Sequence, residues 1–202
     1  NGIAYHLDLS YKGERCYLHG TDIAFQLCKV LDISGEVTIQ FYKMATYPIL
    51  AYHVDTDELS KLRSLGKMCA LMSYRDTNQE IRIVALVEDK FKVISKRKAY
   101  SESKVILGAN IVNDEIVQLV ANQGNFFERV VALNKELLNR VVSENSWVFG
   151  RINLLTYPID PASISIKLSG ELGGNSYKSS IFGDNTLLGD IFFSRRKDDD
   201  WN

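Results

Sequence analysis

Two stretches of the chain place apolar residues at the spacing of an amphipathic helix. In segment 125–143 (NFFERVVALNKELLNRVVS) the apolar residues fall on one stripe, which one polar residue, Asn134, interrupts. The stripe consists of Phe127, Val130, Val131, Leu137, Leu138 and Val141. Such a stripe predicts a helix that packs one face on a core. Segment 20–31 shows the pattern over a shorter length, and we expect Thr21 or Asp22 to cap its first turn.

Short β-prone runs precede and follow both predicted helices in the same order. Residues 4–11 precede the first helix, and residues 115–121 precede the second. Later in each half, two β-prone runs flank polar turn residues, which predicts a hairpin. The paired runs are 68–74 with 80–87 in the first half and 176–182 with 187–194 in the second.

An internal repeat connects the two halves. Segment 35–49 (GEVTIQFYKMATYPI) aligns without gaps on 145–159 (NSWVFGRINLLTYPI), an offset of 110 positions from Ile49 to Ile159, and both segments end in Thr-Tyr-Pro-Ile. A repeat of this length indicates two copies of one structural unit. The first half also carries the insertion DTDELSKLRSLGK, which predicts a short helix ending at Gly66. The second half has SGELGGNS there, which predicts a tight hairpin turn.

The elements of each half read strand, helix and then four strands, so the fold class is α+β. Consecutive strands with short connections are expected to be antiparallel neighbours, with the helix buried against the sheet. This order resembles the hot-dog fold, and the repeat resembles the tandem, double hot-dog arrangement, in which two copies pair side by side. A pair of ferredoxin-like units is the competing architecture, but it needs a second full helix in each half.

The resulting domain organisation is a first hot-dog-like repeat over 1–89, a linker over 90–113, a second repeat over 114–195 and a polar tail over 196–202. Within the linker, residues 105–107 (VIL) are expected to add a strand.

Composition excludes several classes of protein. With 46% hydrophobic and 24% charged residues the chain is globular, and a net charge of -1 provides no overall field for nucleic acid. No apolar run approaches the roughly 18 residues of a membrane span, and no signal-peptide layout opens the chain, so we expect a cytoplasmic protein. The three cysteines, Cys16, Cys28 and Cys69, form no CxxC pair and are expected to be reduced.

The absence of several motifs further limits the reactions that the sequence supports. The chain has no GxxxxGK[ST], GxGxxG, HExxH or GxSxG motif, so nucleotide binding, zinc proteolysis and the common serine-hydrolase elbow lack support. Two residues separate Cys16 from His19, but no second Cys or His pair completes four ligands, so we expect no metal.

The most informative constellation is His19-Gly20-Thr21-Asp22. It combines an acid/base residue, an accessible glycine amide and a carboxylate at the start of a helix, where free N–H groups stabilise an oxyanion. The hot-dog resemblance implies that His19, Gly20 and Asp22 face Glu128, near the start of the second helix. It also implies one site at most, because the offset aligns His19 with Arg129.

Each of these residues also has a purely structural interpretation. Asp22 would serve equally as a helix cap, and Glu128 suits the first turn of its helix through the dipole alone. Asn134, a polar residue on an apolar stripe, is either satisfied by backbone or faces a cavity, and we name it with Gly20 as a substrate-binding candidate.

The resemblance implies an enzyme that processes acyl thioesters in biosynthetic or lipid-type metabolism, by hydrolysis, dehydration or acyl transfer, with a tunnel between the halves. An acyl-CoA or an acyl carrier protein would supply the substrate, no cofactor is expected, and a homodimer is compatible with the fold. The alternative is a non-catalytic binding module for an apolar ligand or a partner protein in the same cleft.

Overall fold

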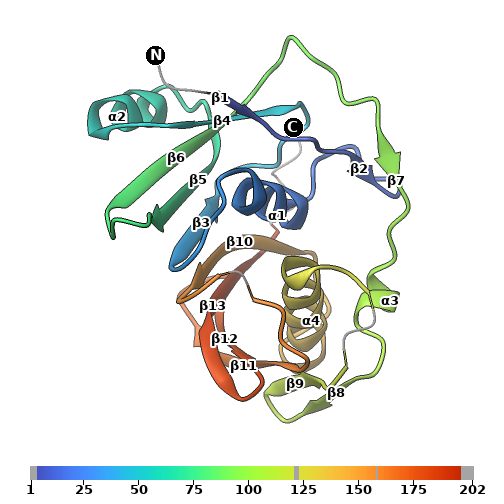
Figure 1. The fold of residues 1–202 in the computed structure, drawn as a ribbon. Helices are drawn as coiled ribbons and strands as arrows, with labels where there is room; N and C mark the ends of the chain where they lie inside the picture. The colour runs from blue at the N-terminus through green and yellow to red at the C-terminus, as the bar shows by residue number, and fades with distance from the viewer. Residues whose placement is uncertain (1–3, 121–122, 158, 197–202) are drawn as a thin grey trace. The chain divides into compact units, whose positions relative to one another are not determined.

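The structure is a computed structural model that describes residues 4–120, 123–157 and 159–196 (Figure 1). The chain divides into two compact units. Unit 1 comprises Asn1–Ser101 with Leu155–Pro158, and unit 2 comprises Glu102–Leu154 with Ile159–Asn202. Most of the tail predicted over 196–202 lies outside the described residues.

Unit 1 is built on an antiparallel sheet with the strand order β1-β4-β6-β5-β3. Its strands are β1 (Ala4–His6), β3 (Val37–Phe41), β4 (Ile49–His53), β5 (Met68–Arg75) and β6 (Ile81–Glu88). A second, two-stranded sheet pairs β2 (Tyr11–Lys12) in parallel with β7 (Arg97–Lys98). β7 lies within the segment 90–113, which was expected to link the two halves and to form a strand at 105–107, not at this position.

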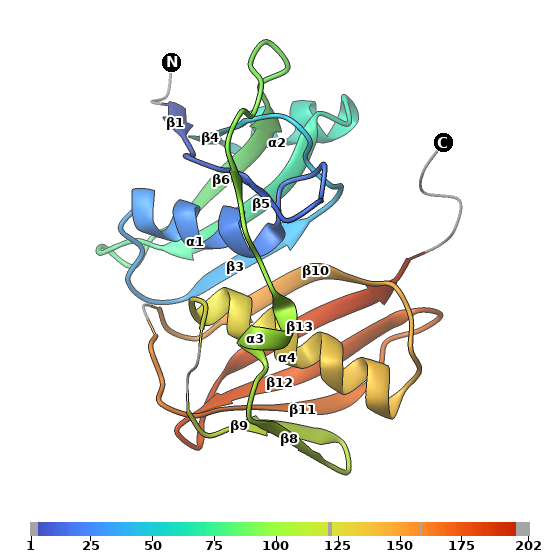
Figure 2. The same cartoon turned by 90° about the vertical axis from the view of Figure 1, so that its right-hand side faces the viewer.

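Two helices belong to unit 1. The first, α1 (Gly20–Val30), buries Ile23, Ala24, Leu27 and Cys28 and lies beside the sheet in Figures 1 and 2. Its N-cap is His19, so the prediction that Thr21 or Asp22 caps it was wrong, because the helix begins earlier and takes both residues into its first turn. The second helix, α2 (Thr56–Ser64), is the predicted insertion helix, with the Asp55 side chain accepting from the Glu58 amide at 2.8 Å.

The second helix closes a small apolar cluster against the sheet. Leu59 of α2 packs with Val54, Met68 and Ala85, which are all buried. An amphipathic helix of this length is marginal in isolation, so this contact stabilises it.

Unit 2 has one longer antiparallel sheet with the strand order β10-β13-β12-β11-β9-β8. Its strands are β8 (Ala109–Val112), β9 (Glu115–Gln118), β10 (Trp147–Leu154), β11 (Ile164–Glu171), β12 (Ser176–Gly183) and β13 (Thr186–Arg195). Helix α4 (Phe126–Val141) lies across one face of this sheet and contacts β9 and β11 (Figure 2). The predicted fold class is therefore confirmed: each unit is a helix packed on an antiparallel sheet, as in the hot-dog fold.

The ends of α4 follow its sequence closely. The Asn125 side chain accepts from the Glu128 amide at 3.1 Å, and Glu128 Oε2 accepts from the Asn125 amide at 2.9 Å, which forms a capping box. By contrast, the strand expected at 105–107 was wrong. Val105 is buried at the end of the short helix α3 (Glu102–Val105), which Glu102 ties to α4 through an ion pair with Lys135 at 2.9 Å.

The hairpins expected in the two halves are confirmed as β5 with β6 and β12 with β13, but they are inserted in opposite orders. In unit 2, β12 pairs with β11, to which a short turn connects it. In unit 1, β6 lies between β4 and β5, so β4 and β5 are parallel and are not neighbours. The expectation that all consecutive strands are neighbours was therefore wrong for this pair. The connection through α2 is long enough to cross over one strand, whereas a tight turn is not.

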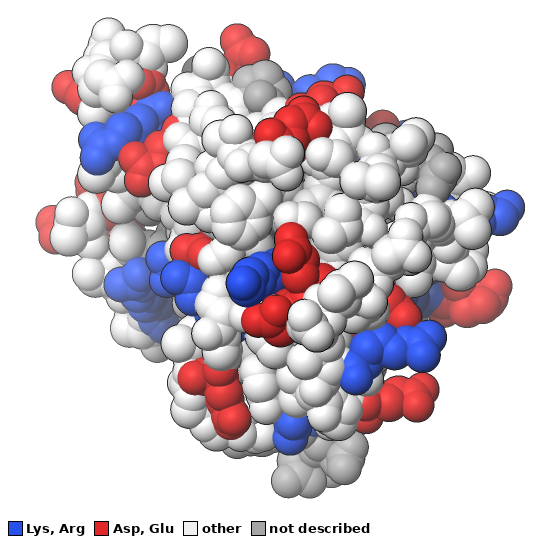
Figure 3. Space-filling view, turned by 90° about the horizontal axis from the view of Figure 1, so that it is seen from below, with Lys and Arg blue, Asp and Glu red and all other residues white. Residues whose placement is uncertain are grey.

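Charges on the surface are mixed in sign. On the face seen in Figure 3, basic and acidic side chains are interspersed. Among the described residues, no helix is both long and apolar enough to cross a membrane.

Candidate functional site

The N-terminal end of α1 holds the histidine that the sequence singled out. His19 occupies the N-cap position with φ -77° and ψ 130°, but its side chain makes no capping hydrogen bond. Instead its Nδ1 atom lies 2.7 Å from Thr21 Oγ1, and its ring centroid lies 5.5 Å from that of Tyr100. These contacts fix the ring in one orientation beside the amides of the first helical turn.

Asp22 lies three positions after His19 in the sequence and makes different contacts. Its carboxylate pairs with Lys12 Nζ at 2.9 Å and with Lys98 Nζ at 3.1 Å. The Lys12 side chain is 0% exposed, and its Nζ atom also donates to Thr21 Oγ1 at 3.2 Å. A connected polar chain therefore runs from Asp22 through Lys12 and Thr21 to His19.

Gly20 is the first residue of α1 and lies in the sequence between His19 and Asp22, the two ends of this polar chain. In this first turn the Asp22 and Ile23 amides donate to the His19 carbonyl at 3.0 and 3.2 Å, and Gly20 adds no Cβ beside the His19 ring. The structure thus brings the three unit 1 candidates, His19, Gly20 and Asp22, to one helix end. Their assembly with the unit 2 candidates into one site stays a prediction.

The two unit 2 candidates lie on α4. The Glu128 carboxylate closes the capping box described above, which accounts for it structurally. Asn134 is 0% exposed, and neither its Oδ1 nor its Nδ2 atom has a hydrogen-bond partner. Ser179, on the inward face of β12, is likewise fully buried with an unpartnered hydroxyl. Unsatisfied buried amides are rare, so Asn134 remains the odd residue of this core.

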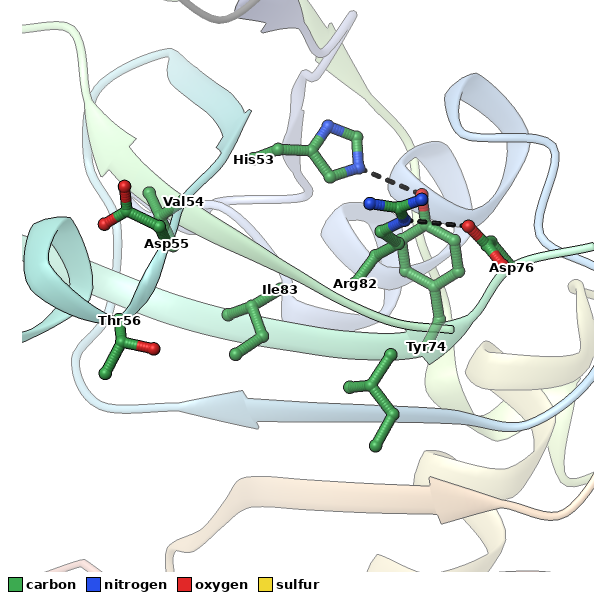
Figure 4. Close-up of a pocket in the computed structure, with 9 residues that line it drawn as sticks. His53, Val54, Asp55, Thr56, Tyr74, Asp76, Arg82 and Ile83 are labelled. Atoms are coloured by element: carbon green, nitrogen blue, oxygen red, sulfur yellow. Dashed lines mark hydrogen bonds and ion pairs between the residues drawn. The ribbon is translucent and has the colours of Figure 1, made fainter. Parts of the chain in front are cut away.

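A second polar group in unit 1, which the sequence pattern did not reveal, lies at an open hollow beside the end of β4 (Figure 4). The hollow has a volume of about 690 Å³. It is lined by His53, Val54, Asp55, Thr56, Tyr74, Asp76, Ile81, Arg82 and Ile83. These residues come from β4, β5, β6 and the start of α2, so only the strand register reveals that they meet.

Hydrogen bonds order the polar side of this hollow. His53 Nε2 lies 2.9 Å from Tyr74 Oη, and Arg82 Nε donates to Asp76 Oδ2 at 2.7 Å (Figure 4). Burial and the nearby Arg82 guanidinium lower the pKa of His53, while burial raises the pKa of Tyr74. The hydrogen bond from Arg82 lowers the pKa of Asp76. At neutral pH His53 is therefore an uncharged ring paired with a phenol, beside an ionised carboxylate.

Metal ligands do not gather in the part of the chain that the structure describes, where no group of three or more His, Cys, Asp or Glu side chains could hold an ion.

Comparison with known proteins finds similarity only at the level of structure. No protein-family model and no curated protein matches the chain. Solved structures similar to it include the dehydratase domain of PpsC from Mycobacterium tuberculosis in complex with C12:1-CoA, at 8% identity and a TM-score of 0.49, covering 96% of this chain and 93% of that one. The dehydratase domain of RzxB from Pseudomonas fluorescens has 12% identity and a TM-score of 0.45, with coverage of 96% and 94%. An acyl-ACP thioesterase from Bacteroides thetaiotaomicron has 8% identity and a TM-score of 0.43, with coverage of 96% and 97%.

Proposed function

We propose that this protein is an acyl-thioester-processing enzyme in which His19 acts as the general acid/base. The observation that carries the proposal is the His19 ring at the N-terminal end of α1, with Nδ1 held 2.7 Å from Thr21 Oγ1. The substrate class follows from the resemblance of each helix-and-sheet unit to the hot-dog fold. Hydrolysis, dehydration and acyl transfer all require a proton to be moved near a thioester carbonyl, which is the chemistry such a histidine supplies.

The polar chain behind His19 holds its ring in place. Lys12 donates to Thr21 Oγ1, and the Thr21 hydroxyl either donates to His19 Nδ1 or accepts from it, according to the tautomer of the ring. Asp22 holds the Lys12 ammonium in place through their ion pair and is therefore a positioning residue. Since Nδ1 contacts Thr21, we assign the exchange of a proton with the substrate to Nε2.

The helix end complements this proton transfer. A thioester carbonyl placed at the first turn of α1 would develop negative charge beside the Gly20 amide and the positive end of the helix dipole. Preorganised donors of this kind typically contribute a factor of about 10² to 10³ in rate. Gly20 would allow the closest approach.

The test is turnover by the purified full chain on acyl-CoA esters of several chain lengths, including 3-hydroxyacyl-CoA. Release of free thiol reports hydrolysis, and absorbance of the conjugated enoyl product reports dehydration. We expect His19→Gln to lower kcat by about 10²- to 10⁴-fold with an unchanged melting temperature. The exposed His6, replaced in the same way, is the matched control. Full activity of the His19 variant, or no turnover of any thioester by the wild-type protein, rejects the proposal.

The second candidate is a non-catalytic binding module, which the unpartnered amide of Asn134 favours, because a ligand group could satisfy it. A thermal-shift series with the same acyl-CoA esters and with apolar small molecules separates the two functions. A ligand at 100 times its Kd stabilises the folded protein by about 2.7 kcal/mol. Stabilisation without turnover would identify a binding module.

A further inference from the structure

The hollow of Figure 4 lies beside the start of β6, where this strand extends beyond the end of its neighbour β4. β4 ends at His53, which pairs with Val84, whereas β6 begins three residues earlier, at Ile81. The segment leaving β4 makes one backbone bond to this stretch, from the Val54 amide to the Ile83 carbonyl at 3.0 Å. Beyond that bond, no strand among residues 4–120, 123–157 and 159–196 pairs with the start of β6 on this side.

The direction of the backbone groups follows from that same bond. Since the Ile83 carbonyl points toward the β4 side, and strands repeat every two residues, the amide and carbonyl of Ile81 point the same way. The backbone of Arg82 points to the other side, where it pairs with Tyr74 of β5. The hollow therefore presents strand-pairing groups at Ile81, whose side chain is also 62% exposed. Unpaired edges of this kind are templates for an added strand.

The side chains around the hollow set its charge. The carboxylates of Asp55, Asp76 and Glu80 lie on or beside it, and among its described lining residues Arg82, which pairs with Asp76 and Glu80, is the one Lys or Arg. The first turn of α2 adds two further acidic residues, Asp57 and Glu58. A partner that enters this hollow meets an excess of negative charge and therefore carries positive charge itself.

We propose that unit 1 binds an extended, basic peptide segment, which adds as a short strand beside Ile81 at the start of β6, where β6 extends beyond β4 in this hollow. Ladder hydrogen bonds to Ile81 give the affinity, as in other complexes formed by strand addition. The aliphatic side chains of Val54, Ile81 and Ile83 receive alternate apolar residues of the peptide. Lysine or arginine residues between them pair with Asp55 and Asp76.

The experiment uses the full chain and fluorescence anisotropy of a labelled peptide, acetyl-Lys-Val-Arg-Val-Lys-amide. Two control peptides separate the contributions: Glu-Val-Glu-Val-Glu reverses the charge, and Lys-Pro-Arg-Pro-Lys keeps it but lacks two ladder donors. We expect each control to bind at least about tenfold more weakly than the basic peptide. Equal binding of the acidic peptide overturns the charge argument, and equal binding of the proline peptide overturns strand addition.

Two protein variants place the binding at this edge. Ile81→Pro removes the amide that faces the hollow but no bond to β5, and we expect about a tenfold loss of peptide affinity, with Ile81→Thr as its control. Asp55→Ser keeps a residue able to cap α2 and removes one charge, so binding should weaken and its salt dependence should decrease. Unchanged affinity in both Ile81→Pro and Asp55→Ser refutes the site. If Ile81→Pro does not fold, the proline peptide and Asp55→Ser still decide the question.

Discussion

The buried ion pair between Lys12 and Asp22 offers the most direct test of how unit 1 is held together. Asp22→Asn preserves the shape of the side chain but removes its charge. The Lys12 ammonium, 0% exposed, then remains buried beside a neutral amide. Breaking a buried pair from one side typically destabilises a protein by about 3 to 5 kcal/mol. Lys98, which is 48% exposed, pairs with the same carboxylate and contributes at most about 1 kcal/mol.

For a chain of this size, about 3 to 5 kcal/mol corresponds to a fall of roughly 6 to 20 °C in melting temperature. Both tryptophans, Trp147 and Trp201, fall outside residues 1–101, so their fluorescence is a poor probe of unit 1. Amide hydrogen exchange of α1, followed by mass spectrometry in Asp22→Asn and wild type, measures the local loss directly.

The matched control restores an apolar pair. Lys12→Met combined with Asp22→Leu removes both charges, so we expect it to recover most of the stability lost by Asp22→Asn. Lys98→Met alone should lower stability by less than about 1 kcal/mol. A buried ion pair is contradicted if Asp22→Asn lowers the free energy of unfolding by less than about 1 kcal/mol. It is also contradicted if this decrease disappears in high salt, as expected of an exposed pair.

Other residues yield shorter tests. Asn134→Leu should raise stability by about 1 to 3 kcal/mol in urea titrations, because it removes an unpartnered buried amide, and a loss would show that a ligand or water satisfies it. In the native protein a thiol reagent should modify the exposed Cys16 and spare Cys28 and Cys69, which are buried. Burial also raises the pKa of Cys69 to about 12, which keeps its thiol unreactive. Fast modification of all three cysteines would contradict this prediction. The pKa of His53 is lower in the folded protein than its usual value of about 6.5. The contribution of His53 to folding stability is therefore complete above about pH 6.5 and is lost as the pH falls below that value. His53→Gln should therefore flatten the fall in stability between about pH 7 and 5, and an unchanged slope would contradict the assignment.

Local signals predicted the regular elements well. The stripe that predicted a helix over 125–143 appears as α4, whose Asn125 and Glu128 form the capping box that such a sequence favours. The start of α1 was predicted less well, because His19 is not a usual cap and Thr21 and Asp22 both are. At that position a tertiary contact, the pairing of Asp22 with Lys12, prevailed over local capping preference.

The candidate site was only partly accessible from the sequence. His19, Gly20 and Asp22 are neighbours along the chain, so a motif reading found them. Lys12 and Lys98 were missed, because the pairing of β2 with β7 brings together residues more than 80 positions apart. No local pattern encodes such a contact.

The insertion in the first half changes the strand order of unit 1, which the sequence repeat alone does not predict. An alignment of the halves treats DTDELSKLRSLGK as an added surface helix on an otherwise common unit. In the structure this segment carries the chain across β6, so the hairpin of unit 1 enters its sheet in the opposite order to the hairpin of unit 2. Its first residues, Asp55 and Thr56, also form one wall of the acidic hollow. The tight turn at the equivalent place in unit 2 keeps β11 and β12 paired and supplies no such wall. The two units thus differ in strand order through a single connection, and the peptide site proposed for the hollow lies in unit 1.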